Sequence, residues 1–306
     1  MKVAFAGTPE FAATILSGLM DSTHEVGLVI SQPDARRGRG RKTARPPVAE
    51  SALEAGLPLR QPTRISEVAD EVSDNDVLVV AAYGQILRPD TLHAARLGAY
   101  NVHASLLPAY RGAAPVERAI MAGATRTGVT IMQMDEGLDT GHIALQLPCP
   151  IGPDTTGGEL THMLAEIGSK AIVDALGLLE KQSLTLTPQD NLKATYAARL
   201  TVEDMVVRWE RGVEEVHDQV RALAPHVGAR TFHPEVDGPI KILRSRIPED
   251  DAPYLEPGEI FTANGRILVG CGRNAVEILE LQKPGSRVLS TASFLLGNSL
   301  QGRFEL

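Results

Sequence analysis

Residues 1–20, MKVAFAGTPEFAATILSGLM, combine a short apolar run with a helical pattern. Val3–Ala6 is apolar and bounded by turn or polar residues, as a buried strand is. Pro9–Met20 has apolar residues at helical spacing and opens with proline, which the first turn of a helix tolerates. This stretch therefore predicts a strand followed by a helix.

The same alternation continues through the first half of the chain. Further strands are expected at Val26–Ile30, Val77–Ala81 and Tyr100–His103, and a further helix at Pro46–Ala55. Repeated strand–helix units indicate an α/β fold with a Rossmann-like, mostly parallel sheet and crossover helices. Ligands of such sheets bind at the carboxyl ends of the strands, so the residues near position 103 are candidates for chemistry.

The pattern changes after a long helix expected at Gly158–Lys181. Residues 185–200 are polar and irregular, and a helix is expected at Val213–Leu223. Five short segments separated by turn signals then predict a small β-barrel. They are Ala229–His233, Ile240–Ser245, Gly258–Phe261, Arg266–Val269 and Ala275–Leu281, with a closing helix at Ser290–Leu296. We therefore expect domains at residues 1–189 and 205–306, joined by a linker at 190–204.

Composition narrows the class of protein. The chain has 306 residues, 43% apolar and 22% charged, as soluble globular proteins do. It has no apolar run of transmembrane length and no signal-peptide pattern at its start, so a cytoplasmic protein is expected. Its two cysteines are too few for a disulfide framework, and small buried side chains are the simpler interpretation. We expect a monomer, because no extended apolar interface pattern occurs.

The formal net charge of −8 excludes a protein that coats nucleic acid generally. Any contact with nucleic acid must be local, and one acid-free stretch is strongly basic. Its residues are Arg36, Arg37, Arg39, Arg41, Lys42 and Arg45. A solvated loop and an anion-binding loop both fit this run.

Asn101 and His103 lie two residues apart at the end of a predicted strand, so their side chains share a face. An asparagine amide can donate a hydrogen bond to an oxyanion, and histidine can carry a proton near neutral pH. The following loop, Met134–His142, contains Asp135, Glu136 and Asp139, and a carboxylate near a histidine orients its ring. An acidic surface turn fits that loop equally well.

Two other motifs carry less chemistry. The turn after the first strand lacks GxGxxG, so no dinucleotide site is expected. Glu159, His162 and Glu166 lie three and four apart on a predicted helix, where a solvated face is the usual explanation. We therefore expect no metal.

The segments NVHASLLPAYRGAAPVERAIMAG and TGVTIMQMDEGLDTGHI resemble the signature region of the folate-dependent formyltransferases. The resemblance extends from FAGTPEFA through SQPDARRGRGRK to the C-terminal barrel, which it identifies as OB-like. It implies catalytic roles for Asn101, His103 and Asp139. It also implies that a folate packs against Ser105, Leu106, Leu107 and Pro108, with 10-formyltetrahydrofolate as the formyl donor.

Within this family the chain is most similar to the members that act on tRNA. The similarity implies formyl transfer to the α-amine of methionine on initiator methionyl-tRNA, for translation initiation in bacteria. It also implies that the basic loop contacts the acceptor end of the tRNA, chiefly through Arg39. The residues expected to bind tRNA are Arg36, Arg37, Arg39, Arg41 and Lys42; the first two are additions to the family's pattern. The barrel is expected to contribute modestly.

Two alternatives remain at this point. A formyltransferase acting on a small amine, such as a sugar nucleotide or glycinamide ribonucleotide, would use the same three catalytic residues. The basic loop and the added barrel favour tRNA instead. A non-catalytic RNA-binding module is disfavoured, because Asn101, His103 and Asp139 are all present.

Overall fold

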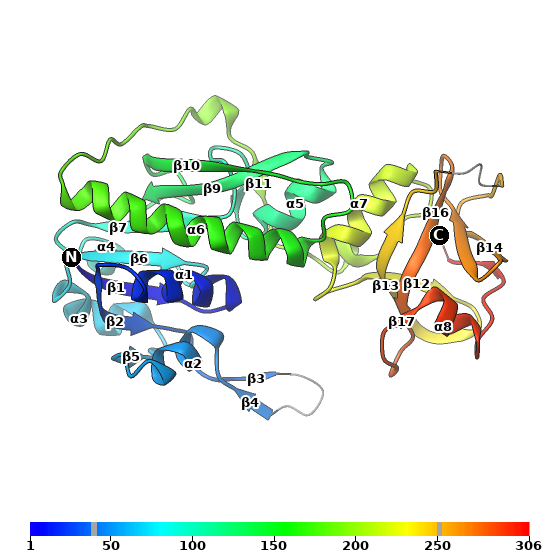
Figure 1. Cartoon of the computed structure of the whole chain (residues 1–306), viewed down its shortest axis with the longest axis horizontal. Helices are drawn as coiled ribbons and strands as arrows, with labels where there is room; N and C mark the ends of the chain where they lie inside the picture. The colour runs from blue at the N-terminus through cyan, green and yellow to red at the C-terminus, as the bar shows by residue number, and fades with distance from the viewer. Residues whose placement is uncertain (38–41, 250–252, 306) are drawn as a thin grey trace. The chain divides into compact units, whose positions relative to one another are not determined.

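A computed structural model describes residues 1–37, 42–249 and 253–305 (Figure 1). Contacts divide the chain into two compact units. The first contains residues 1–115, 126–150 and 161–197, and the second contains residues 116–125, 151–160 and 198–306. The expected domain boundaries at residues 189 and 205 stay a prediction.

The first unit is built on a seven-stranded sheet of order β10-β9-β7-β6-β1-β2-β5. Its strands are β1 (Lys2–Gly7), β2 (Glu25–Ile30), β5 (Leu59–Arg60), β6 (Val77–Ala81), β7 (Ala99–His103), β9 (Arg126–Gln133) and β10 (Ile143–Pro150). β5, β2, β1, β6 and β7 pair in parallel, whereas β9 and β10 add an antiparallel edge. The predicted mostly parallel sheet is confirmed, with all four of its predicted strands.

Sequence patterns did not reveal β9 and β10. Six consecutive residues of β9 are buried, so the strand shows no alternation of apolar and polar positions. β10 contains Pro148 and Pro150, which sheets tolerate at an edge but which obscure a strand in the sequence. This pair matters for the candidate site, because the loop between the two strands carries Asp139.

The expected helices of the first half form as α1 (Glu10–Met20), α2 (Pro47–Glu54) and α6 (Gly157–Glu180). α6 runs along the sheet beside α1 (Figure 1). A Cβ at Gly168 would lie 2.8 Å from Val102 Cγ1 of β7, so glycine permits this close approach. Val102 therefore faces α6, and its neighbours Asn101 and His103 face the opposite side of the sheet.

Shorter elements complete this unit. A hairpin of β3 (Ala35–Arg37) and β4 (Lys42–Ala44) follows β2. The others are η1 (Ile65–Val68), α3 (Ala69–Ser73), α4 (Pro89–Leu92), β8 (Arg111–Gly112), α5 (Pro115–Met121), η2 (Asn191–Lys193) and β11 (Tyr196–Ala197), of which α5 groups with the second unit. β11 pairs in parallel with β8, so part of the expected linker is attached to the loop that follows His103.

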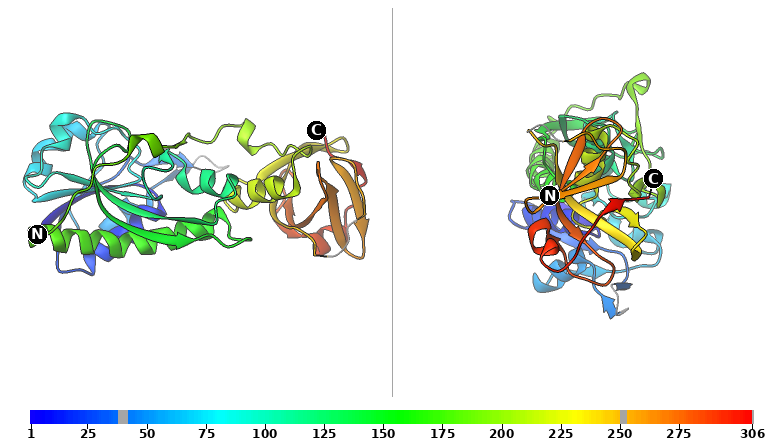
Figure 2. Two further views of the ribbon diagram at one scale, coloured as in Figure 1. Left: turned by 90° about the horizontal axis from the view of Figure 1, so that it is seen from above. Right: turned by 90° about the vertical axis from the view of Figure 1, so that its right-hand side faces the viewer.

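The second unit contains an antiparallel sheet of order β12-β13-β16-β15-β14-β18, with β17 paired to β16. Its elements are η3 (Glu203–Met205), α7 (Val213–Leu223), β12 (Ala229–His233), β13 (Val236–Arg246), β14 (Glu259–Ala263), β15 (Arg266–Gly270), β16 (Ala275–Gln282), β17 (Leu289–Ser290), α8 (Thr291–Leu295) and β18 (Gly302–Arg303). The strands curl around a shared interior (Figure 2). The predicted small barrel, its five strands and its two helices are confirmed.

Trp209 is fully buried in this interior. Its ring stacks on Phe304 with the centroids 5.5 Å apart, and its Nε1 donates to Thr231 Oγ1 at 3.0 Å. Cys149 and Cys271 are buried free thiols, which confirms the prediction of small buried side chains. Within the described ranges, no helix is long and apolar enough to cross a membrane.

Candidate active site

Asn101 and His103 lie on β7, which is hydrogen-bonded to neighbours on both sides. Asn101 is paired with Val80 of β6 and with Met132 of β9, and His103 is paired with Thr130 of β9. Strands on both sides hold the backbone, so the two side chains leave the sheet from fixed points. Asn101 is half-buried and His103 is buried, with 5% of its surface exposed.

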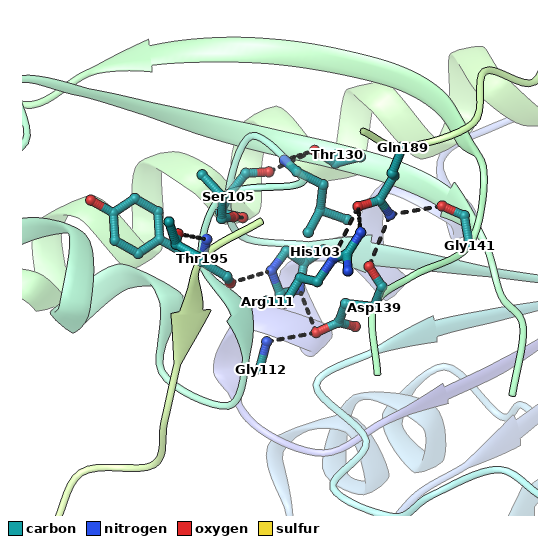
Figure 3. Close-up of polar contacts among 12 residues, drawn as sticks. His103, Ser105, Arg111, Gly112, Thr130, Asp139, Gly141, Gln189 and Thr195 are labelled. Atoms are coloured by element: carbon teal, nitrogen blue, oxygen red, sulfur yellow. Dashed lines mark hydrogen bonds and ion pairs between the residues drawn. The ribbon is translucent and has the colours of Figure 1, made fainter. Parts of the chain in front are cut away.

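The hydrogen bond of His103 determines which ring nitrogen can exchange a proton. Its Nε2 lies 3.0 Å from the carbonyl oxygen of Tyr110 (Figure 3). A carbonyl only accepts hydrogen bonds, so Nε2 carries the hydrogen and donates it. Nδ1 is then the nitrogen left to take up a proton, and it lies 3.7 Å from Asp139 Oδ2. A proton on Nδ1 would face a carboxylate.

Asp139 is held in a tight turn. Its backbone has φ +52°, the left-handed region that few residues other than glycine adopt. Its Oδ2 accepts a hydrogen bond from the Gly112 N–H at 2.8 Å, while Asp135 Oδ1 accepts from Gly137 N and Thr140 Oγ1 at 3.0 and 2.7 Å. The acidic segment Met134–His142 thus carries one carboxylate to His103 and uses another to shape its own turn.

The loop 104–110 curls back to His103, and hydrogen bonds from β9 hold its backbone. Thr130 Oγ1 donates to the Ser105 carbonyl at 2.7 Å and accepts from the Leu107 N–H at 3.0 Å. Ser105 and Leu107 are buried, and the Ser105 hydroxyl donates to the Ala109 carbonyl. Leu106 and Pro108 are half-buried, so these two residues of the expected folate segment keep exposed surface.

Three further residues of this neighbourhood received no role from the sequence, although Arg111 lies within the segment that resembles the family's signature. Arg111 follows the loop, and Gln189 and Asn191 lie at the start of the polar segment that looked like a linker. The Arg111 guanidinium donates to Gln189 Oε1 and Asn191 Oδ1, and Gln189 Nε2 donates to two carbonyls of the Asp139 turn (Figure 3).

The basic segment lies apart in sequence but follows a strand of the same sheet. Arg36 and Arg37 are in β3 and Lys42 is in β4, whereas Arg39 and Arg41 lie outside the described residues. The hairpin follows the carboxyl end of β2, and His103 is at the carboxyl end of β7. β2 and β7 are parallel within one sheet, so both features emerge at the same edge.

Comparison with known proteins gives matches over most of the chain. Residues 1–176 match the family model described as formyl transferase, and residues 199–299 match that of the formyl transferase C-terminal domain. A methionyl-tRNA formyltransferase of Rubrobacter xylanophilus is 65% identical over 302 residues, which cover 99% of each chain. Another, from Symbiobacterium thermophilum, is 43% identical and covers 98% of this chain and 94% of its own.

A solved structure shares the fold at low identity. The N-formyltransferase of Helicobacter canadensis, in complex with folinic acid and dTDP-3-aminofucose, superposes with a TM-score of 0.67 at 18% identity. The match covers 91% of this chain and 98% of that one. At this identity the likeness supports the fold and carries no argument about the substrate.

Proposed function

The chain belongs to the formyl transferase family, and from this membership we propose that it formylates the α-amine of methionine on initiator methionyl-tRNA. The observation that carries the proposal is the 65% identity, over 99% of both chains, to a protein named methionyl-tRNA formyltransferase. Formylation would yield N-formylmethionyl-tRNA for translation initiation.

We propose 10-formyltetrahydrofolate as the formyl donor. Leu106 and Pro108 offer partly exposed apolar surface in the loop that follows His103, which suits the flat face of an aromatic ring such as those of a folate. The contacts of Ser105 and Leu107 with Thr130 fix the backbone of that surface. In this proposal Leu106 and Pro108 touch the donor, while Ser105 and Leu107 shape the loop.

Direct transfer accounts for the chemistry of the three candidate residues. The amine nitrogen attacks the formyl carbon, a nitrogen–carbon bond forms, and the bond from that carbon to the folate nitrogen breaks. Asn101 would donate a hydrogen bond to the oxyanion of the tetrahedral intermediate. Loss of one such donor typically raises the barrier by about 3 kcal/mol.

The proton balance requires a carrier. The attacking nitrogen loses one proton and the departing folate nitrogen gains one, so a single group can serve both steps. His103 would use Nδ1 for this purpose, because Nε2 is engaged with the Tyr110 carbonyl. Asp139 would stabilise the protonated ring across the 3.7 Å that separates Oδ2 from Nδ1.

For the acceptor, we propose that the basic segment binds the tRNA near its aminoacylated end. Arg36, Arg37 and Lys42 are in the hairpin that follows the carboxyl end of β2, at the sheet edge to which β7 brings His103. Arginine side chains bind phosphates with two donors each, which supplies local attraction on a chain of net charge −8. Arg39 and Arg41 are assigned to the same contact from the sequence.

The test is a formylation assay with three acceptors. The full chain is incubated with 10-formyltetrahydrofolate and, in separate reactions, charged initiator methionyl-tRNA, a dTDP-amino sugar or glycinamide ribonucleotide. We expect product only in the reaction with methionyl-tRNA, where hydrolysis of the tRNA ester should release N-formylmethionine. Formylation of a small amine without formylation of methionyl-tRNA would establish the alternative, and no product in any reaction would reject a formyltransferase activity.

A further inference from the structure

Gln189 bridges two carbonyl groups of the turn that carries Asp139. Its Nε2 donates to the carbonyl oxygens of Asp139 and Gly141 at 2.8 and 2.7 Å (Figure 3). These carbonyls lie on either side of Thr140, so one side-chain amide holds the backbone before and after that residue. Both hydrogens of the amide are used in this way, and the bridge consequently fixes the turn.

Arg111 fixes the orientation of that amide. Its Nε and one terminal nitrogen donate to Gln189 Oε1 at 3.1 and 2.7 Å, so the oxygen faces the guanidinium and the nitrogen faces the carbonyls. A second hydrogen bond runs from the same terminal nitrogen to Asn191 Oδ1 at 2.8 Å. Arg111 is 2% exposed. Because the local dielectric constant is low there, its positive charge polarises the Gln189 amide and strengthens the hydrogen bonds that the amide donates.

The turn needs such support because Asp139 has a left-handed backbone, which is unfavourable for a residue with a Cβ. Its carboxylate also has to meet two partners in different directions, the Gly112 N–H and the His103 ring. Gly112 directly follows Arg111, so one short strand supplies both the amide that binds the carboxylate and the guanidinium that orients Gln189. The two contacts therefore fix Asp139 from its side chain and from its backbone.

We propose that Gln189, oriented by Arg111, is a positioning residue that places the Asp139 carboxylate against His103. The inference rests on the proposed formyl transfer. It assigns a function to the segment after α6: through Gln189 this segment controls the geometry of a catalytic pair located on β7 and in the β9–β10 turn. The hydrogen bonds of Gln189 reach Arg111 and the backbone of the Asp139 turn, so it acts through that turn.

Gln189→Glu is the most informative variant. Glutamate keeps the size and the acceptor that faces Arg111, but it replaces the Nε2 donor with an oxygen that repels the two carbonyls. Displacing a catalytic group by about 1 Å costs on the order of a hundredfold in rate, so we expect kcat to fall by that factor. KM for the folate and for the tRNA should change little. Gln189→Met, which removes both sets of hydrogen bonds at similar size, should lower kcat similarly.

Asn191→Ala is the matched control. It removes one hydrogen bond from the same guanidinium without touching the Asp139 turn, and kcat should stay within about threefold of wild type. The spectroscopic readout is the amide resonance of Gly112 in the ¹H–¹⁵N spectrum of the full chain. It should shift in both Gln189 variants, because its acceptor is Asp139 Oδ2, and remain in place in Asn191→Ala.

The outcomes separate the two proposals. Wild-type protein that formylates no acceptor would reject the proposed function, while the Gly112 resonance would still report whether Gln189 positions Asp139. An active wild type with near-normal kcat in folded Gln189→Glu or Gln189→Met would overturn the positioning role. A lower melting temperature without a change in kcat or in the Gly112 resonance would also overturn it, since a merely structural contact behaves in that way.

Discussion

Replacing Asp139 by asparagine tests the electrostatic half of the proposed site. The asparagine oxygen can still accept from the Gly112 N–H, so the turn is kept while the negative charge is lost. That charge faces His103 Nδ1 at 3.7 Å, and the exposed fractions of the two side chains are only 14% and 6%. At an effective dielectric constant of about 20, unit charges at this separation attract by about 4 kcal/mol.

This attraction acts when the ring is protonated during transfer. Its loss should therefore lower kcat by about a thousandfold, since each 1.4 kcal/mol corresponds to about a factor of ten. The assay is steady-state formylation of initiator methionyl-tRNA at saturating donor, with circular dichroism to verify folding. KM values should change by no more than a few-fold.

Asp135→Asn is the control for charge. This exposed carboxylate is in the same turn, and an asparagine oxygen can accept the same hydrogen bonds from Gly137 and Thr140. Its kcat should stay within about threefold of wild type. A fall of less than tenfold in Asp139→Asn, or an equal fall in both variants, would refute a specific electrostatic role for Asp139.

Three further predictions rest on the structure, and one, for Arg39, rests on the sequence. His103→Ala should lower kcat by at least about a hundredfold while circular dichroism stays native, and near-normal turnover would reject a proton carrier at this position. Arg39→Ala should raise KM for tRNA but not for folate. It should also reduce the slope of log affinity for tRNA against log salt concentration by about one unit, because one phosphate contact is lost. Unchanged kinetics with tRNA would show that this segment is a solvated loop without a role in binding. Hydrogen bonds from Arg118 lower the pKa of Asp204 from 3.8 to about 2, so its stabilisation is present above pH 4 and is lost as the pH falls toward 2. Asp204→Asn should therefore cost about 1–2 kcal/mol of unfolding free energy in denaturant titrations at pH 7, with a smaller difference from wild type at pH 3, and a pH-independent difference would contradict the ion pair. Burial raises the pKa of Cys271 to about 12, so an aromatic disulfide reagent should label neither cysteine until the protein is unfolded, and rapid labelling of native protein would contradict that burial.

Much of the fold was predictable because regular elements impose a period on apolar residues. The helix Val213–Leu223 carries that period clearly, and the strands ending at Ala81 and His103 were predictable as short apolar runs bounded by turn or polar residues. The antiparallel edge formed by β9 and β10 was not predicted. β9 is buried on both faces and does not alternate, and Gly128 and Thr130 also interrupt its apolar run; the edge strand β10 contains two prolines.

The candidate site was likewise predictable in part. The sequence alone determined that Asn101 and His103 leave one strand on one face, because a strand alternates its side chains with a period of two. Family resemblance selected Asp139 from the three carboxylates of its loop. Only the structure could identify Nδ1 as the nitrogen of His103 without a backbone partner among the described residues. Nε2 donates a hydrogen bond to the Tyr110 carbonyl, which the curved loop after β7 brings close to the ring.

Only the tertiary structure decided how Asp139 is held. The β9–β10 turn brings Asp139 to within 3.7 Å of His103, and Gln189 reaches the same turn although it lies 78 residues from its partner Arg111. Isolated polar side chains have no period, and a contact between distant segments depends on how strands pair and loops return. The local chemistry of Asn101 and His103 was therefore determined by the sequence, and the placement of Asp139 by the packing of segments far apart in the chain.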